Sequence, residues 1–184
     1  MSTARRPTKA KPKNAIDVMV VGAAWTKALR TPAAIVRRAA TAALAETAGK
    51  LSAEVSILLT NDSALRELNR TYRGKNKPTN VLSFPALTPD ELPTRGPVSL
   101  GDVAVAYGVT AGEARAEGKT VKAHLSHLVV HGVLHLLGYD HEGDRDAATM
   151  ERMEKKILAG LGIADPYADS YAQAGPAPRT RRRA

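Results

Sequence analysis

The five histidines are the feature of this sequence that most limits what the chain can fold into. They all fall in one short stretch, as His124, His127, His131, His135 and His141. Between Leu125 and Tyr139 that stretch is otherwise nearly apolar. It is too short to span a membrane, and titratable side chains within so apolar a run indicate a protein interior. The sequence therefore predicts a buried helix that carries a row of histidines.

The spacing of three of these histidines is typical of a metal site. His131 and His135 are one helical turn apart, about 40° from each other around the axis, so both imidazoles can reach one ion. Gly138 can end the helix in a left-handed turn, after which His141 can fold back over the same face. Three neutral nitrogens leave a fourth tetrahedral position open, as in catalytic zinc sites. We therefore predict one Zn²⁺ per chain, bound by His131, His135 and His141; a buried hydrogen-bonded cluster is the alternative.

The same spacing occurs in metzincin zinc proteases, but one residue of their motif is missing. The position after the first histidine holds the glutamate that acts as general base in those enzymes, and here it is Gly132. Asp140, Glu142 and Asp144 are the nearby acids that could replace it, although one of them could instead orient His141. The missing glutamate argues against peptide cleavage.

The remaining two histidines are expected to have other roles. His127 lies one turn before His131 on the same face, and we expect it to pack in the core or beside a ligand rather than to bind the metal. We expect His124 to lie nearer the surface.

The net charge of +9, from 27 Lys and Arg against 18 Asp and Glu, belongs to the two ends of the chain. Residues 1–14 and 170–184 contain basic residues and no acid, whereas the stretch between them is formally neutral. We therefore predict a basic, disordered N-tail (1–14), a single domain (15–165) and a basic, disordered C-tail (166–184). The tails can add salt-sensitive phosphate contacts, but the domain is not expected to be a broadly basic nucleic-acid binder.

Composition excludes further classes of protein. The chain has no cysteine, which excludes disulfide scaffolds and thiolate metal sites. One Trp, one Phe and five Tyr are too few for a surface that stacks bases on aromatic rings. The first residues lack the apolar segment of a secretory signal, so a cytoplasmic location is expected.

Hydrophobic patterning predicts an α+β fold, with helices packed on a small four-stranded mixed sheet and the zinc motif on a central helix. A long flexible loop is expected over residues 85–99, which hold four prolines and a glycine. The strands are predicted at residues 16–21, 55–59, 81–84 and 101–107, and the helices at residues 32–47, 63–72, 110–117, 121–137 and 145–159.

Three segments together resemble the YbeY family of bacterial zinc-dependent endoribonucleases, which are also described as ribosomal RNA maturation factors. One is the histidine segment from His131 to His141, which reads HGVLHLLGYDH. The second is LNRTYRGKNKPTNVLSFP, from Leu68 to Pro85, and the third is LGDV, from Leu100 to Val103. The resemblance covers roughly residues 53–160, and the combination of the three segments makes it specific.

The resemblance implies zinc at His131, His135 and His141, with Arg73 as the functional arginine near the metal. It implies cleavage of single-stranded RNA in the 3′-end maturation of small-subunit (16S) ribosomal RNA and in ribosome quality control. It also implies the small ribosomal subunit, an assembly GTPase and an exoribonuclease as partners. Asn80 departs from the family pattern, because many members carry Asp there, so residue 80 is given no acid or base role.

Several mechanistic points stay open. An arginine can grip a phosphate through two hydrogen bonds, so we expect Arg73 to stabilise the transition state of phosphoryl transfer. Either a metal-activated water or the RNA 2′-hydroxyl can be the nucleophile. Ser83, Asn80 and Asp102 either line the site or have structural roles at strand ends. The alternative functions are a ribosome-assembly factor with a structural zinc and a metal-dependent hydrolase of another substrate.

Overall fold

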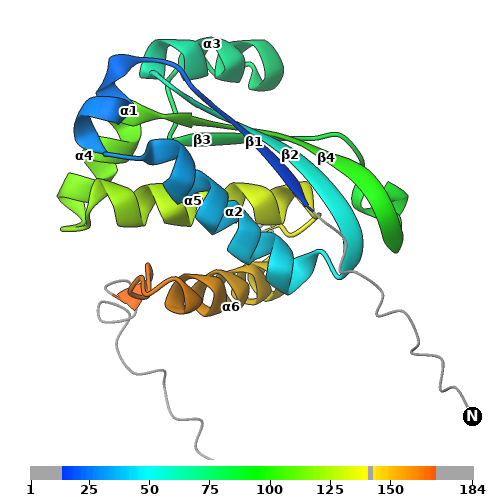
Figure 1. Ribbon diagram of the computed structural model, residues 1–184. Helices are drawn as coiled ribbons and strands as arrows, with labels where there is room; N and C mark the ends of the chain where they lie inside the picture. The colour runs from blue at the N-terminus through cyan, green and yellow to red at the C-terminus, as the bar shows by residue number, and fades with distance from the viewer. Residues whose placement is uncertain (1–13, 141–142, 169–184) are drawn as a thin grey trace, which may run out of the picture.

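Four strands form one mixed sheet in the order β1-β2-β4-β3 (Figure 1). The structure is a computed structural model and describes residues 14–140 and 143–168. Strands β1 (Ala15–Val20), β2 (Lys50–Thr60) and β4 (Arg95–Ala106) are parallel to one another. The edge strand β3 (Val81–Pro85) is antiparallel to β4. A mixed four-stranded sheet was predicted, and it is confirmed.

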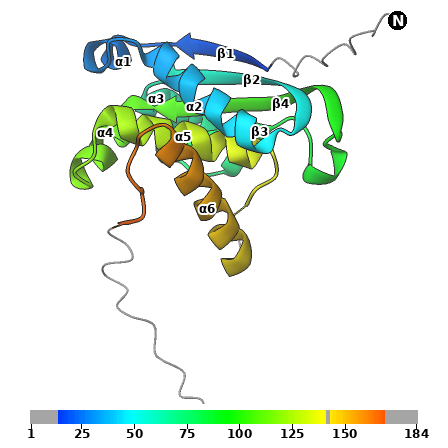
Figure 2. The ribbon, with the colours of Figure 1, turned by 60° about the horizontal axis from the view of Figure 1, so that its bottom comes forward.

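Helices cover both faces of this sheet, but unequally. α2 (Pro32–Thr47) and α5 (Val121–Leu136) pack on one face, and α6 (Asp144–Gly160) packs against both of them (Figures 1 and 2). α3 (Asp62–Arg73) lies on the opposite face (Figure 1). The predicted α+β class with the histidine motif on a central helix is therefore confirmed.

The core lies between the sheet and the layer that contains α2 and α5. In β2, Val55, Ile57 and Leu59 are buried at alternate positions, as expected for a strand whose two faces have different surroundings. α5 is buried along most of its length, and it begins where the Thr120 hydroxyl accepts a hydrogen bond from the Ala123 amide (3.1 Å). The near-apolar sequence of α5 thus reflects contacts on several sides.

Part of the predicted 85–99 loop is regular structure. The 3₁₀ helix η1 (Pro89–Glu91) lies within it, and β4 begins at Arg95. The predicted strand 101–107 also ends too late, because α4 (Tyr107–Ala116) begins at its last residue. A proline and a glycine interrupt the alternation of buried and exposed residues at the start of β4. This explains why the first residues of β4 were predicted as part of a loop.

A short helix, α1 (Ala23–Ala28), was not predicted. It carries the only tryptophan, Trp25, which is completely buried. The indole Nε1 of Trp25 donates to the carbonyl of Thr60 (2.9 Å), and its ring lies edge-on to Tyr107 at 5.1 Å. Tertiary packing rather than helix propensity therefore fixes this element.

Side-chain contacts of the described residues continue just past residue 165, the predicted end of the domain. Lys119 donates to the carbonyl of Pro166 (2.8 Å), and the Tyr167 hydroxyl donates to Glu154. These contacts involve residues 166 and 167, and the extents of the domain and of the C-tail stay predictions. The N-tail prediction falls almost entirely outside the described residues, as does the C-tail beyond 168. Among the described helices, none has both the length and the apolar character that a membrane crossing requires.

A β-bulge in β4 breaks the sheet's alternation. Glu54 pairs with Ser99, but the next residue, Val55, pairs with Gly101. Leu100 is thus the extra residue, and it is completely buried. The bulge changes which residues of β4 face the core. For this reason the sequence of β4 shows no regular alternation of buried and exposed residues over the whole strand.

Gly101 is required at this bulge for two reasons. Its φ of 116° is one that side chains rarely allow. A Cβ atom at this position would lie 2.1 Å from the carbonyl oxygen of Phe84, on the paired strand β3. Gly96, on the same strand, also has a positive φ (94°), but a Cβ there would have open space around it.

These two glycines predict different losses of stability. Gly96→Ala introduces backbone strain alone and should lower the free energy of unfolding by about 1–3 kcal/mol. Gly101→Ala adds a collision with backbone and should cost clearly more than Gly96→Ala. Denaturant unfolding of both variants measures the difference, and equal losses would contradict the steric argument.

Candidate active site

His131 and His135 lie on one face of α5, as predicted. Their Nε2 atoms are 3.1 Å apart, and their ring centroids are 4.5 Å apart. Neutral imidazole nitrogens are common ligands of zinc, so this pair of donors fits a divalent ion. His141, the third predicted ligand, lies outside the described residues, and no group of three metal-ligand side chains occurs among those described. Zinc binding therefore stays a prediction.

A buried carboxylate from α6 contacts the same histidine. Glu154 is completely buried, and its Oε1 lies 2.7 Å from Nδ1 of His131. Its Oε2 accepts a hydrogen bond from the Tyr167 hydroxyl and lies 3.6 Å from Nε2 of His127. Burial opposes ionisation of Glu154, but the facing His127 and His131 rings and the Tyr167 hydroxyl together lower its pKa to about 2. Glu154 is thus a carboxylate at neutral pH.

Arg73 and His135 line one cavity, whose volume is about 480 Å³. Arg73 is the last residue of α3, which ends at the left-handed Gly74 (φ 66°). Because β3 is the edge strand, the end of α3 can reach the α5 side of the sheet although α3 itself packs on the other side. The remaining lining comes from β3, the turn that contains η1, and the residues that follow α5: Ser83, Pro85, Ala86, Leu87, Thr88, Pro89, Glu91, Gly138, Tyr139 and Asp140.

Close packing on the sheet explains why the position after His131 is a glycine. A Cβ atom at Gly132 would lie 2.7 Å from Cγ1 of Val103 and 3.2 Å from Oγ of Ser83. Ser83 also donates its hydroxyl hydrogen to the carbonyl of Gly132 (3.2 Å). The position that holds the protease base in metzincins therefore faces the sheet here, where a glutamate side chain has no room.

His127 and His124 differ in how well they were predicted. His127 packs beside His131, one of the predicted ligands, with their ring centroids 6.3 Å apart. The prediction that His124 lies near the surface is wrong, because His124 is 5% exposed and its Nε2 lies 2.8 Å from Oε2 of Glu113. A partner from α4 allows this polar ring to be buried, and the sequence does not reveal such a contact.

The other three candidate residues, Ser83, Asn80 and Asp102, do not lie in one site. Ser83 lines the cavity with Arg73, whereas Asn80 and His131 are part of the lining of a second cavity. Asn80 is engaged structurally, since its Oδ1 accepts from the Val81 amide (2.6 Å) and its Nδ2 donates to Glu113. Asp102 is not part of the site, because it lies in a groove on the opposite face of the sheet.

Comparison with known proteins identifies the family. The family model described as "Endoribonuclease YbeY" matches residues 24–162. The chain belongs to the YbeY endoribonuclease family. This confirms the resemblance seen in the three sequence segments.

Curated YbeY relatives are similar over most of the chain, and each is named Endoribonuclease YbeY. One from Rhodopseudomonas palustris is 48% identical over 156 residues, which cover 84% of this chain and 93% of the relative. One from Bradyrhizobium diazoefficiens is 50% identical over 155 residues (83% and 85%). One from Chelativorans is 53% identical over 135 residues (73% and 82%).

A solved structure supports the fold. The solution structure of a Thermotoga maritima protein matches with a TM-score of 0.54 and 24% sequence identity. The match covers 91% of this chain and 99% of the other. At this identity the likeness concerns the fold alone.

Sequence reasoning missed Glu154 and Tyr167. A signal existed for Glu154, because it interrupts the buried stripe of α6 formed by Met150, Ile157 and Leu158. A lone acid on the apolar face of an amphipathic helix indicates a buried partner. Tyr167 gave no such signal, and it lies beyond residue 162, where the match to the YbeY family model ends.

Gly132→Ala should destabilise the protein although alanine favours helices. The added Cβ must displace Val103 or Ser83, and overpacking of this kind costs about 1–3 kcal/mol. Gly112→Ala in α4 is the control, because a Cβ there has open space and should be neutral or slightly stabilising. Thermal unfolding compares the two, and equal effects would contradict the close helix–sheet contact.

Proposed function

We propose that this chain is a zinc-dependent, single-strand-specific endoribonuclease. Its proposed role is 3′-end maturation of small-subunit ribosomal RNA and ribosome quality control. The observation that carries the proposal is that Arg73 and His135 line one cavity, with His131 directly beside His135. Membership of an endoribonuclease family agrees with it.

His131 and His135, together with His141, are the residues that would hold the zinc ion. When bound, the ion supplies Lewis-acid chemistry, which polarises a phosphodiester or lowers the pKa of water. The two described histidines supply neutral nitrogen donors, which suit zinc better than magnesium or calcium.

Arg73 is proposed to bind and stabilise the reacting phosphate. Its guanidinium can donate two parallel hydrogen bonds to non-bridging phosphate oxygens and neutralise the charge that develops on them. It is exposed at the end of α3, so a substrate strand can reach it. Lys75 and Lys77 follow in the next loop and are also exposed, where they can contact neighbouring phosphates.

Asp140 is the carboxylate best placed to orient either the nucleophile or His141. The described lining of the cavity also contains Glu91, but Oε2 of Glu91 accepts from the amide and the hydroxyl of Thr88, both at 2.8 Å. Glu91 therefore caps its own turn. Asp140 directly precedes His141 and lies in the same lining as Arg73.

Arg73→Ala should leave zinc binding intact and slow RNA cleavage by about 10²–10³, the effect of losing one charge-stabilising donor. Arg73→Lys should recover only part of the rate, because lysine keeps the charge but loses the two-pronged geometry. Single-turnover cleavage and zinc content are measured together. Arg70→Ala is the matched control, since Arg70 is on the same helix and pairs with Glu67 (2.5 Å). Unchanged cleavage by Arg73→Ala would show that the proposed role is wrong.

Substrate class and metal dependence are tested in one experiment. The zinc-loaded protein is incubated with a single-stranded ribosomal RNA fragment, its deoxy counterpart and unstructured peptides, each with and without a chelator. Chelator-sensitive cleavage of the RNA, with no cleavage of the peptides, is the expected result. A cyclic phosphate end would identify the 2′-hydroxyl as nucleophile, whereas a linear end and cleavage of the deoxy strand would identify water. Peptide cleavage, or RNA cleavage that survives chelation, would overturn the proposal.

A further inference from the structure

Glu154 is a charged side chain in a place where charge is costly. It is completely buried on α6, among the apolar residues Met150, Ile157 and Leu158. Burying an ionised carboxylate is unfavourable unless hydrogen bonds satisfy it. Both oxygens of Glu154 have partners, and both partners come from other segments: His131 from α5, and Tyr167 from the segment after α6.

The contact with Glu154 fixes which nitrogen of His131 carries hydrogen. A carboxylate can only accept hydrogen bonds, so at 2.7 Å the Nδ1 atom of His131 must be the donor. In a neutral imidazole, Nε2 then holds the lone pair. That atom faces Nε2 of His135 at 3.1 Å, in the position where a metal would be bound. Carboxylates that orient a liganding histidine in this way usually strengthen metal binding.

Tyr167 holds the carboxylate from the other side. Its hydroxyl donates to Oε2 of Glu154, and its ring lies edge-on to His127 at 5.7 Å. Nζ of Lys155 lies 5.5 Å from the centre of the same ring. Both oxygens of the carboxylate are thus engaged, which leaves it little freedom to turn away from His131.

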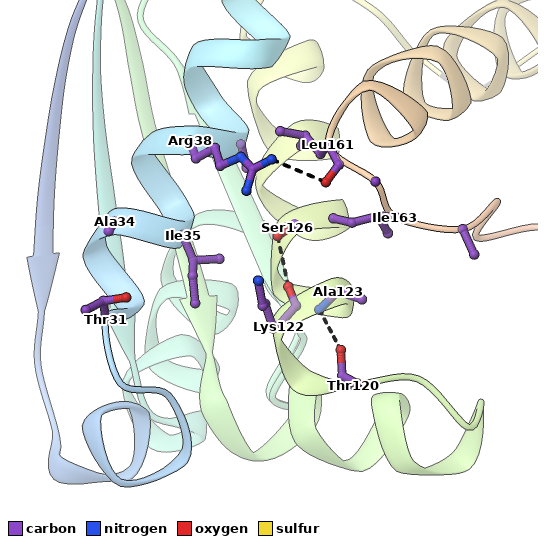
Figure 3. A pocket seen from close by; sticks show the side chains of 13 residues that line it. Thr31, Ala34, Ile35, Arg38, Thr120, Lys122, Ala123, Ser126, Leu161 and Ile163 are labelled. Atoms are coloured by element: carbon purple, nitrogen blue, oxygen red, sulfur yellow. Dashed lines mark hydrogen bonds between the residues drawn. The ribbon is translucent and has the colours of Figure 1, made fainter.

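The segment that carries Tyr167 is tied to the domain at several points. Arg38 of α2 donates to the carbonyl of Leu161 (3.5 Å; Figure 3), and Lys119 donates to that of Pro166 (2.8 Å). Within the segment itself, the Tyr167 amide donates to Oδ1 of Asp165 (2.8 Å). These contacts hold the tyrosine over Glu154 although it lies beyond the region that the family model matches.

We propose that Glu154 and Tyr167 are positioning residues for the metal centre, which hold His131 with the lone pair of its Nε2 directed at the ion. Glu154 sets the tautomer and the ring orientation, and Tyr167 sets the orientation of Glu154. This inference rests on the metal site in the proposed function, but it does not depend on the substrate.

The test compares three variants that remove one polar partner each. Glu154→Gln keeps the size of the side chain but can donate or accept, so it no longer imposes a tautomer. Tyr167→Phe removes only the hydroxyl. Glu113→Gln is the matched control, because Glu113 forms a His–Glu contact on α5 with a different histidine, His124.

Two quantities are measured on the full chain. Zinc affinity, from competition with a chromophoric chelator, should fall about 10–100-fold in Glu154→Gln. It should fall about 2–10-fold in Tyr167→Phe, the loss of one hydrogen bond, and stay within about twofold in Glu113→Gln. Nitrogen NMR of the metal-free protein should show His131 protonated at Nδ1 in the wild type and Tyr167→Phe, and a mixture of tautomers in Glu154→Gln.

Each outcome decides a separate point. Wild-type zinc affinity and an unchanged His131 tautomer in Glu154→Gln would overturn the proposal. If Glu154→Gln fails to fold, Tyr167→Phe decides, and unchanged zinc affinity in that variant overturns the role of the pair. A wild-type chain that binds no zinc overturns the metal site and the positioning role together. Zinc binding without RNA cleavage overturns only the proposed nuclease function.

Discussion

The close approach of α5 to the sheet is the constraint on which the rest of the site depends. Gly132 allows it, because any side chain there would collide with Val103 of β4. With that face of α5 against the sheet, His131 and His135 lie side by side on the helix with their Nε2 atoms adjacent. Gly132 stands where metzincins carry their general base. The same glycine lets α5, the helix with the histidines, pack closely on the sheet.

Several parts of the fold could be predicted because they depend on local patterning. α2 begins at Pro32, where a proline at the first helical position indicates a start, and the predicted bounds match the structure. The turn-by-turn spacing of His131 and His135 likewise required only helix geometry. Features that depend on residues far away in the sequence were not predicted. The helix α1 is stabilised by the burial of Trp25, and the bulge at Leu100 arises from the pairing of β4 with β2.

The same distinction explains the errors at the site. A histidine in an apolar helix can be buried only if it has a partner, and the partners of His124 and His131 are acids from α4 and α6. Sequence spacing does not bring residue 154 to residue 131, because the two are joined through tertiary packing of α6 on α5. Arg73 was predicted from family resemblance rather than from its surroundings, since its neighbours in the cavity come from β3, the η1 turn and the end of α5.

The hydrogen bonds between Asn80 and Glu113 limit which side chain can occupy residue 80. Its amide nitrogen donates to both oxygens of Glu113, at 3.2 and 3.0 Å, and Oε2 of Glu113 also lies 2.8 Å from Nε2 of His124. An aspartate in place of Asn80 would set two carboxylates against each other, which is unfavourable unless one is protonated or a cation joins them. The amide at residue 80 and the acid at residue 113 are therefore complementary. This contact accounts for Asn80 through packing and hydrogen bonding, without an acid or base role in the reaction.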